Sequence, residues 1–134
     1  MNFITGIQAT ASALNAEKVR LDVVAQNIAN AHTTRDTDGN AYRRKVVTFE
    51  ALLDPQAGKN GVKVGEIGTD PSQGELVYSP EHPHANADGF VQMPNVNVAM
   101  EMVDLLSASR AYEANLAVAR NARQMAAKAL TIGR

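Results

Sequence analysis

Two long, alanine-rich stretches at the ends of this chain repeat their apolar residues at alternating spacings of four and three. The first covers residues 4–30 and the second covers residues 98–132. This spacing is typical of helices that pack along a shared seam. We therefore expect two terminal helices, packed against each other as an α-helical coiled coil or against copies from other subunits. The residues expected at subunit interfaces are Ile7, Ala11, Leu14, Leu21, Ala25, Ile28 and Asn30 in the first stretch, and Met102, Leu105, Ser109, Tyr112, Leu116, Ala119 and Arg123 in the second.

Helices of this length do not fit inside a compact domain. The chain has 134 residues, and a globule of that size is about 36 Å across. A helix over residues 98–132 would run about 52 Å and one over residues 4–30 about 40 Å. Apolar residues number 22 of the 35 in the second stretch, with Tyr112 as its one large aromatic side chain. The sequence therefore predicts that the helices either break or find burial outside their own chain, with Tyr112 as an anchor.

The middle of the chain has a different composition. Residues 33–41 are polar and turn-prone and predict a loop, whereas residues 42–49 are rich in aromatic and β-branched residues and predict a strand. Alternation of apolar and polar residues at 62–67 predicts a second short strand, a candidate hairpin partner of the first. Residues 68–97 carry four of the five prolines, so we expect an extended loop there.

The expected fold is mainly α, with two long helices around a small β-hairpin and an extended loop. We divide it into an N-terminal helix (residues 1–32), an insert of loop and short strands (33–94) and a C-terminal helix (95–134).

Asparagine and glycine mark the expected helix ends. Asn30 can adopt the left-handed conformation that terminates a helix. Either Asn95 or Asn97 can cap the second helix by accepting a backbone N–H, with Glu101 near the positive end of the helix dipole. Gly133 stands where this helix would stop.

Composition gives little support to nucleic-acid binding or to catalysis. The net charge is −1, and the chain contains no cysteine, so we expect no nucleic-acid partner, no disulfide and no thiolate chemistry. No stretch has the length of a membrane span or the pattern of a cleaved signal peptide. We predict no enzyme activity, no cofactor and no small-molecule substrate.

Two short patterns resemble ion-binding sites but lack essential features. Residues 36–40 begin like a calcium loop, yet the glycine stands at the fourth position and Val47 occupies the place of the bidentate glutamate. His82 and His84, even with His32, lack the spacing and the carboxylates of a metal site. We therefore expect no metal, and we expect these histidines in exposed loops.

Three consecutive basic residues, Arg43, Arg44 and Lys45, precede the second half of the first predicted strand. Because alternate strand residues point to opposite faces, these charges do not form one patch for a phosphate backbone. We expect a solvated strand, or an ion pair with a neighbouring subunit.

Several short motifs near both ends of the chain resemble the signatures of one bacterial family. They are SALN (residues 12–15), VRLDVVAQNIANA (19–31), DGFV (88–91), PNVN (94–97), EM (101–102) and RAYEAN (110–115). Together they are similar to the flagellar rod and hook proteins. The polar residues 36–41 before Tyr42, and the short middle of the chain, resemble the proximal-rod subgroup of that family.

The resemblance implies a structural subunit of the basal-body rod, the drive shaft that crosses the periplasm and transmits torque from the motor to the hook. It implies export by the flagellar type III system and helical assembly, with the terminal helices lining the inside of a tube. The implied partners are other copies of the chain, other rod proteins, and membrane-ring and export-gate components at the base of the rod.

Three alternatives remain open from the sequence. The chain could be a neighbouring proximal-rod subunit of the same family. It could also be a stand-alone helical-bundle adaptor, or a small metal-dependent enzyme built on His32, His82 and His84.

Overall fold

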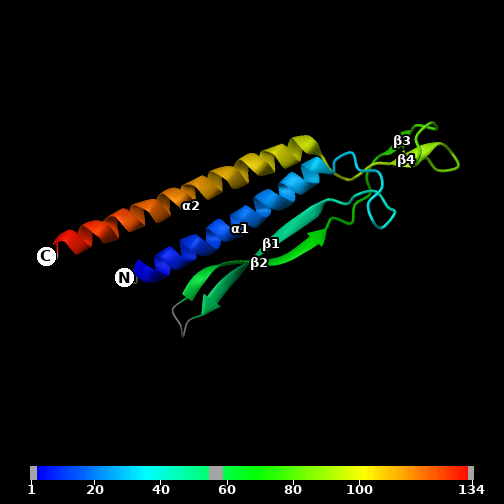
Figure 1. The fold of residues 1–134 in the computed structure, drawn as a ribbon. Coiled ribbons are helices and arrows are strands. Elements are labelled where there is room, and N and C mark those ends of the chain that lie inside the picture. The colour runs from blue at the N-terminus through cyan, green and yellow to red at the C-terminus, as the bar shows by residue number, and fades with distance from the viewer. Residues whose placement is uncertain (1–2, 55–58, 133–134) are drawn as a thin grey trace. The chain divides into compact units, whose positions relative to one another are not determined.

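The computed structural model describes residues 3–54 and 59–132. Its elements, in chain order, are α1 (Phe3–Ala29), β1 (Lys45–Asp54), β2 (Lys59–Thr69), β3 (Leu76–Tyr78), β4 (Phe90–Gln92) and α2 (Val98–Ile132) (Figure 1). The chain divides into two compact units. Unit 1 comprises residues 1–21, 47–66 and 106–134, and unit 2 comprises residues 22–46 and 67–105. Both helices therefore contribute one part to each unit.

The two terminal helices have nearly the bounds expected from the sequence. Of the two candidate capping residues, Asn97 caps α2. Its Oδ1 accepts the backbone N–H groups of Ala99 (3.1 Å) and Met100 (3.2 Å). The expected left-handed conformation of Asn30 is wrong, because no described residue other than glycine has a positive φ. Instead, the carbonyl of Gln26 accepts both the Asn30 side-chain amide at 2.9 Å and the Asn30 backbone N–H at 3.0 Å. Gly133 lies outside the described residues.

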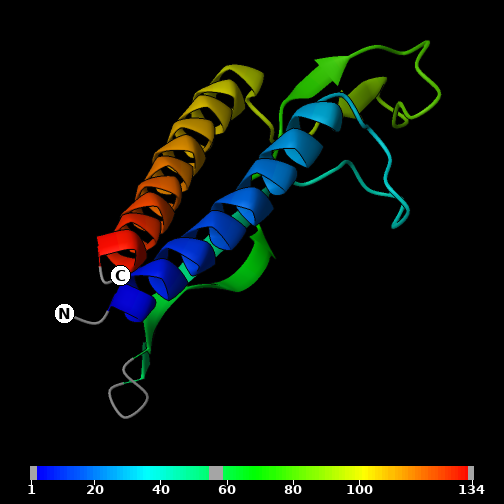
Figure 2. The same ribbon diagram turned by 60° about the vertical axis from the view of Figure 1, so that its left-hand side comes forward.

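In unit 1, the first part of α1 lies alongside the last part of α2 and alongside the β1–β2 hairpin (Figures 1 and 2). Ser12 connects α1 to the hairpin, because its hydroxyl accepts the backbone N–H of Val62 at 3.0 Å. The backbone of β2 therefore passes close to the Ser12 side chain. A Cβ at Gly61 would come within 2.6 Å of the Ser12 Oγ, so a larger residue there would displace the Ser12 hydroxyl.

The hairpin was expected as a possibility and is confirmed, but its strands are longer than predicted. β1 has ten residues and β2 has eleven, and the two pair with each other. Thr48 contacts the backbone of Glu66 while Glu50 forms an ion pair with Lys63, so the strands run antiparallel. These longer strands make the fold less strongly helical than expected. Packing of α1 against α2 as a coiled coil stays a prediction.

In unit 2, the segment expected to be an extended loop contains a second two-stranded sheet. β3 and β4 pair antiparallel, with Leu76 opposite Gln92 and Tyr78 opposite Phe90. The rings of Tyr78 and Phe90 meet edge to face at 5.2 Å. The prolines between residues 68 and 97 therefore border the two short strands instead of preventing them.

Among the described residues, the buried apolar side chains are few and mostly small. In unit 2 they are Val23, Val24, Ala31, Tyr42 and Val91, and in unit 1 they are Ala16 and Ala108. Neither set makes a large core. Within the described residues, no helix has the length and hydropathy needed to cross a bilayer.

Candidate functional site: a buried polar cluster and the exposed faces of the helices

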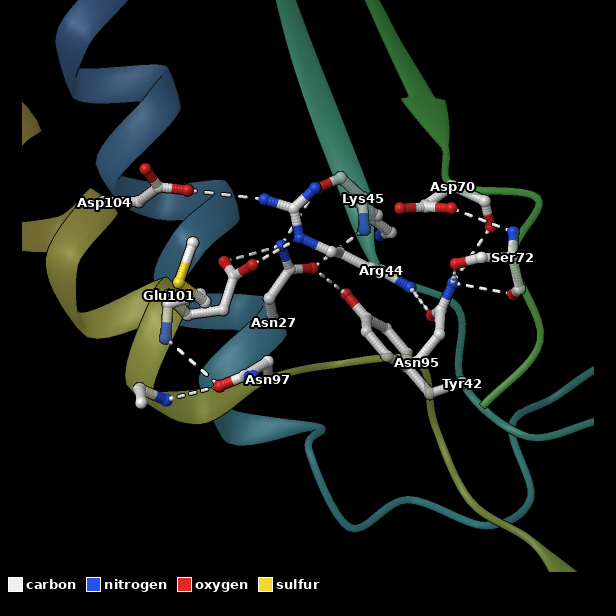
Figure 3. Close-up of polar contacts among 12 residues, drawn as sticks. Asn27, Tyr42, Arg44, Lys45, Asp70, Ser72, Asn95, Asn97, Glu101 and Asp104 are labelled. Atoms are coloured by element: carbon white, nitrogen blue, oxygen red, sulfur yellow. Dashed lines mark hydrogen bonds and ion pairs between the residues drawn. The ribbon is translucent and has the colours of Figure 1, made fainter. Parts of the chain in front are cut away.

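A buried asparagine organises the polar interior of unit 2. Asn27, near the end of α1, is 1% exposed. Its amide nitrogen donates to the carbonyl of Lys45 (2.9 Å) and to the carboxylate of Glu101 (3.0 Å). Its oxygen accepts the Tyr42 hydroxyl and the Lys45 backbone N–H, each at 2.9 Å (Figure 3). All four hydrogen-bonding positions of the amide are used, so the group is buried without an unmet partner.

An ion pair lies beside this amide. Glu101, in the first turn of α2, is fully buried, and its carboxylate accepts a hydrogen bond from Arg44 Nε. A second guanidinium nitrogen of Arg44 lies 3.3 Å from Asp104 (Figure 3). The side chains of Arg44 and Asp104 are 27% and 37% exposed, whereas that of Glu101 is 1% exposed, so the arginine links a buried carboxylate to a partly exposed one. The expectation of a solvated strand or an intersubunit pair is wrong for Arg44, whose partners belong to its own chain.

A second asparagine holds the backbone on the other side of Arg44. The Asn95 oxygen accepts the Arg44 backbone N–H at 2.7 Å. Its amide nitrogen donates to the carbonyls of Asp70 (3.1 Å) and Ser72 (2.9 Å) (Figure 3). Four segments of unit 2 are thus joined by side-chain hydrogen bonds, namely the end of α1, the start of β1, the turn after β2 and the start of α2. We name the set Asn27, Tyr42, Arg44, Asn95 and Glu101 the polar cluster.

The electrostatics of the polar cluster favour its charged and hydrogen-bonded state. The hydrogen bond to Glu101 raises the pKa of the Arg44 guanidinium, which therefore stays charged at any ordinary pH. Burial, followed by the charges of Asp36 and Glu101, raises the pKa of the Tyr42 hydroxyl and keeps it a donor. These hydrogen bonds and the ion pair form a joint between the end of α1, the start of β1 and the start of α2.

Sequence reasoning missed this joint. It treated Glu101 as a residue near the helix dipole and Arg44 as a surface charge. The available signal was Asn27, a polar residue among Val23, Val24 and Ala31 on one helical face. Its partners are 15 to 74 residues away in sequence, which no local pattern reveals.

The residues expected at subunit interfaces are only partly buried, or are exposed, within one copy of the chain. Five of them are exposed, namely Ile7, Ala11, Ala25, Met102 and Arg123. The other nine are half-buried: Leu14, Leu21, Ile28, Asn30, Leu105, Ser109, Tyr112, Leu116 and Ala119. None is fully buried. The fully buried positions of α1, namely Ala16, Val23, Val24 and Asn27, follow a different stripe of the helix.

Helix α2 leaves a wide apolar surface exposed in a single copy. Its exposed large apolar side chains are Met100, Met102, Val103, Leu106, Val118, Met125, Leu130 and Ile132. Eight such residues on one helix exceed what scattered surface residues would account for. Surfaces of this kind mark contacts with other proteins.

Beside the polar cluster, unit 2 has an open polar groove whose lining includes Thr34, Arg35 and His84. The Thr34 hydroxyl lies 2.8 Å from His84 Nδ1, and the ring of His84 meets that of His82 at 5.3 Å. Across residues 3–54 and 59–132, no three histidine, cysteine, aspartate or glutamate side chains come together as metal ligands would.

The imidazole of His84 is expected to titrate below its ordinary value of 6.5. Burial, and then the charges of Arg35 and His82, lower its pKa. The folded state therefore favours the neutral ring. Its contribution to stability is complete above pH 6.5 and is lost as the pH falls below that value. An NMR titration should show the low midpoint, and Arg35→Gln should raise it while Arg43→Gln should not. A wild-type midpoint at or above 6.5 would contradict this arrangement.

Comparison with known families places both ends of the chain in one class. Residues 7–35 match the family described as flagella basal body rod protein. Residues 87–132 match the family described as flagellar basal body rod FlgEFG protein C-terminal. These segments include most of α1 and all of α2, and they include Asn27, Asn95 and Glu101. The class that they define is that of the flagellar axial proteins that form rods.

Curated relatives narrow the class. The flagellar basal-body rod protein FlgC of Bacillus subtilis (strain 168) is 44% identical over the whole of both chains. FlgC of Escherichia coli O6:H1 is 45% identical over 91% of each chain, and FlgC of Borreliella burgdorferi is 38% identical over 98% of each. The chain belongs to the FlgC family of flagellar basal-body rod proteins.

Proposed function

We propose that this chain is a structural subunit of the proximal rod of the bacterial flagellar basal body. The observation that carries the proposal is the exposed apolar surface of α2, together with full-length similarity to proteins named for the rod. A chain with this surface gains most of its remaining apolar burial from neighbours.

Subunits of the rod would meet through heterologous contacts, which build an open helix. The proposed interface positions are the residues expected there from the sequence, seven between Ile7 and Asn30 and seven between Met102 and Arg123. Their incomplete burial in one copy supports this assignment. Coiled-coil packing of the helices would be completed when neighbours add their own helices to the same seams. The segments 1–32 and 95–134 would form the axial core, and 33–94 the insert.

The polar cluster has a mechanical role in this proposal. A drive shaft must resist twisting, and an ion pair and hydrogen bonds among four segments stiffen the junction of each subunit. Loss of one buried partner costs several kcal/mol in such an arrangement, about 3–5 kcal/mol for a buried ion pair. The cluster would therefore hold the end of α1, the start of β1 and the start of α2 together under torque.

Before assembly, the same chain would pass through the flagellar type III export system. The few and small buried side chains support this, because a small core unfolds at little cost. The rod would span the periplasm, with self and other rod proteins as lateral partners. Membrane-ring and export-gate components would lie at its base.

The location of the chain tests the proposal. In a strain that lacks it, the wild-type chain should restore swimming, and electron cryomicroscopy of purified basal bodies should allow the chain to be traced in the rod nearest the membrane ring. Restored swimming without the chain in purified basal bodies would exclude a structural role.

A further inference from the structure

Strand β3 directs the backbone groups of two residues away from β4. In an antiparallel pair, residues that exchange hydrogen bonds alternate with residues whose N–H and C=O groups point outward. The residues just before and just after β3 are bonded to the facing chain. The Glu75 carbonyl accepts a backbone N–H at 2.8 Å, and the Ser79 N–H donates to a backbone carbonyl at 2.9 Å. By alternation, Val77 also faces β4, whereas the N–H and C=O groups of Leu76 and Tyr78 point outward.

The outer edge of β4 is covered by a loop of its own chain. Phe90 directs its backbone groups outward, and both are bonded to Asn86. The Phe90 N–H donates to the Asn86 side-chain oxygen at 2.9 Å, and the Phe90 carbonyl accepts the Asn86 backbone N–H at 2.8 Å. The outward groups of Leu76 and Tyr78 have no such partner among the described residues.

Strand β3 also lacks the features that protect many edge strands. Its sequence, LVY, contains no lysine and no proline, and all three residues are exposed. The outer edge of β3 therefore offers free donors and acceptors to a further strand.

One face of the sheet adds apolar surface to this edge. Facing residues of an antiparallel pair place their side chains on the same side. Leu76, Tyr78 and Phe90 therefore share one face, and Val77 and Val91 share the other. Val91 is 2% exposed, so the second face covers the interior of unit 2, whereas Leu76 and Tyr78 are 59% and 65% exposed on the first. A strand added to β3 would place every second side chain beside these two residues.

The charge of the segments next to β3 is negative. No lysine or arginine occurs between Lys63 and Arg110. Glu75 immediately precedes β3, and Glu81 and Asp88 lie in the segment that joins β3 to β4. All three are exposed. A second copy would bring the same negative charge to this edge, whereas a basic strand would be attracted.

We propose that the outer edge of β3 binds, as a third strand, an extended segment of another protein in which apolar and basic residues alternate. Its backbone would pair with Leu76 and Tyr78, as in other cases of strand addition. Its apolar side chains would contact the exposed face, and its basic side chains would match the negative charge of the surrounding segments. Strand β3 is not among the interface positions proposed for the rod, so this contact is independent of the rod assignment.

A short synthetic peptide of alternating lysine and valine probes this edge. Titrated into the purified full-length chain at low salt, it should bind saturably. The same peptide with glutamate in place of lysine should bind at least about tenfold more weakly, because its charge is repelled. Absence of saturable binding, or equal binding of the two peptides, would overturn the proposal.

Hydrogen exchange followed by NMR identifies the strand that the peptide joins. The amide of Val77 already faces β4, whereas those of Leu76 and Tyr78 are open. Bound peptide should slow exchange at Leu76 and Tyr78 by about tenfold or more and change Val77 far less. Binding that leaves the two open amides unprotected would refute strand addition. Protection that grows with chain concentration in the absence of peptide would assign the edge to a second copy, against the proposal.

Two variants of one residue test the role of its N–H group. Leu76→Pro removes an outward donor but no hydrogen bond between β3 and β4, and Leu76→Ala shortens the same side chain and keeps the donor. The proline variant should bind the lysine peptide about tenfold more weakly than the alanine variant. Both should unfold at nearly the same temperature. Equal binding would exclude pairing at this edge, and a much lower unfolding temperature for Leu76→Pro would show that this N–H has a partner within the chain, which also overturns the proposal.

Discussion

Asn27→Asp is expected to lower the free energy of unfolding by about 3 kcal/mol or more at neutral pH. The replacement has the shape of asparagine but loses both donors. An oxygen then faces the Glu101 carboxylate at 3.0 Å and the Lys45 carbonyl at 2.9 Å, in a position 1% exposed. Thermal unfolding followed by circular dichroism measures the loss. An unchanged midpoint would show that the polar cluster does not hold unit 2 together.

Asn15→Asp is the matched control, because Asn15 lies on the same helix and is exposed. It should change stability by less than about 0.5 kcal/mol. The deficit of Asn27→Asp should also shrink in acid. The introduced carboxyl binds a proton more readily in the folded state than in the unfolded chain, so acid restores a donor and neutral pH removes it.

Val118→Asp is expected to leave the isolated chain stable and to abolish its incorporation into the rod. Val118 is 55% exposed, so a carboxylate there stays hydrated in a single copy and should shift stability by less than about 0.5 kcal/mol. In an assembled rod the same carboxylate would be buried against apolar neighbours, and a cost of about 3 kcal/mol would reduce incorporation roughly a hundredfold. Swimming and the amount of chain in basal bodies are the measurements.

Two further variants make the result specific. Val118→Ile keeps the apolar surface and should swim. Gln124→Asp adds the same charge at an exposed polar position of α2 and should be incorporated far better than Val118→Asp. Equal incorporation of Val118→Asp and wild type would exclude this part of α2 from the interface.

The features that the sequence predicted well are those set by local chemistry. The bounds of α2 follow from its apolar repeat and from an asparagine cap, and the hairpin follows from β-branched residues around a turn-prone segment. The two capping candidates could not be separated, because both Asn95 and Asn97 have the required side chain. The hydrogen bonds that Asn95 makes with the backbone of Arg44, Asp70 and Ser72 show that it has another role.

The features that the sequence did not predict depend on distant partners. Glu101 could be placed at a helix start, but its burial depends on Arg44, 57 residues away. Strands β3 and β4 have three residues each, too few for a periodicity to show. The stripe of α1 that one copy buries passes through Ala16, Val23 and Asn27 and not through Ala11 and Ala25, and the apolar repeat alone does not separate these two stripes.

The most direct test measures the accessibility of α2 before and after assembly. Single cysteines at Leu106, Val118 and Met125, all exposed in one copy, can be placed in this cysteine-free chain, with Thr37→Cys in an exposed loop as the reference. All four should react rapidly with a maleimide in the isolated chain. In purified basal bodies the three α2 cysteines should be protected while the loop cysteine still reacts. Equal reactivity of the α2 cysteines in both states would contradict burial of this helix by neighbouring subunits.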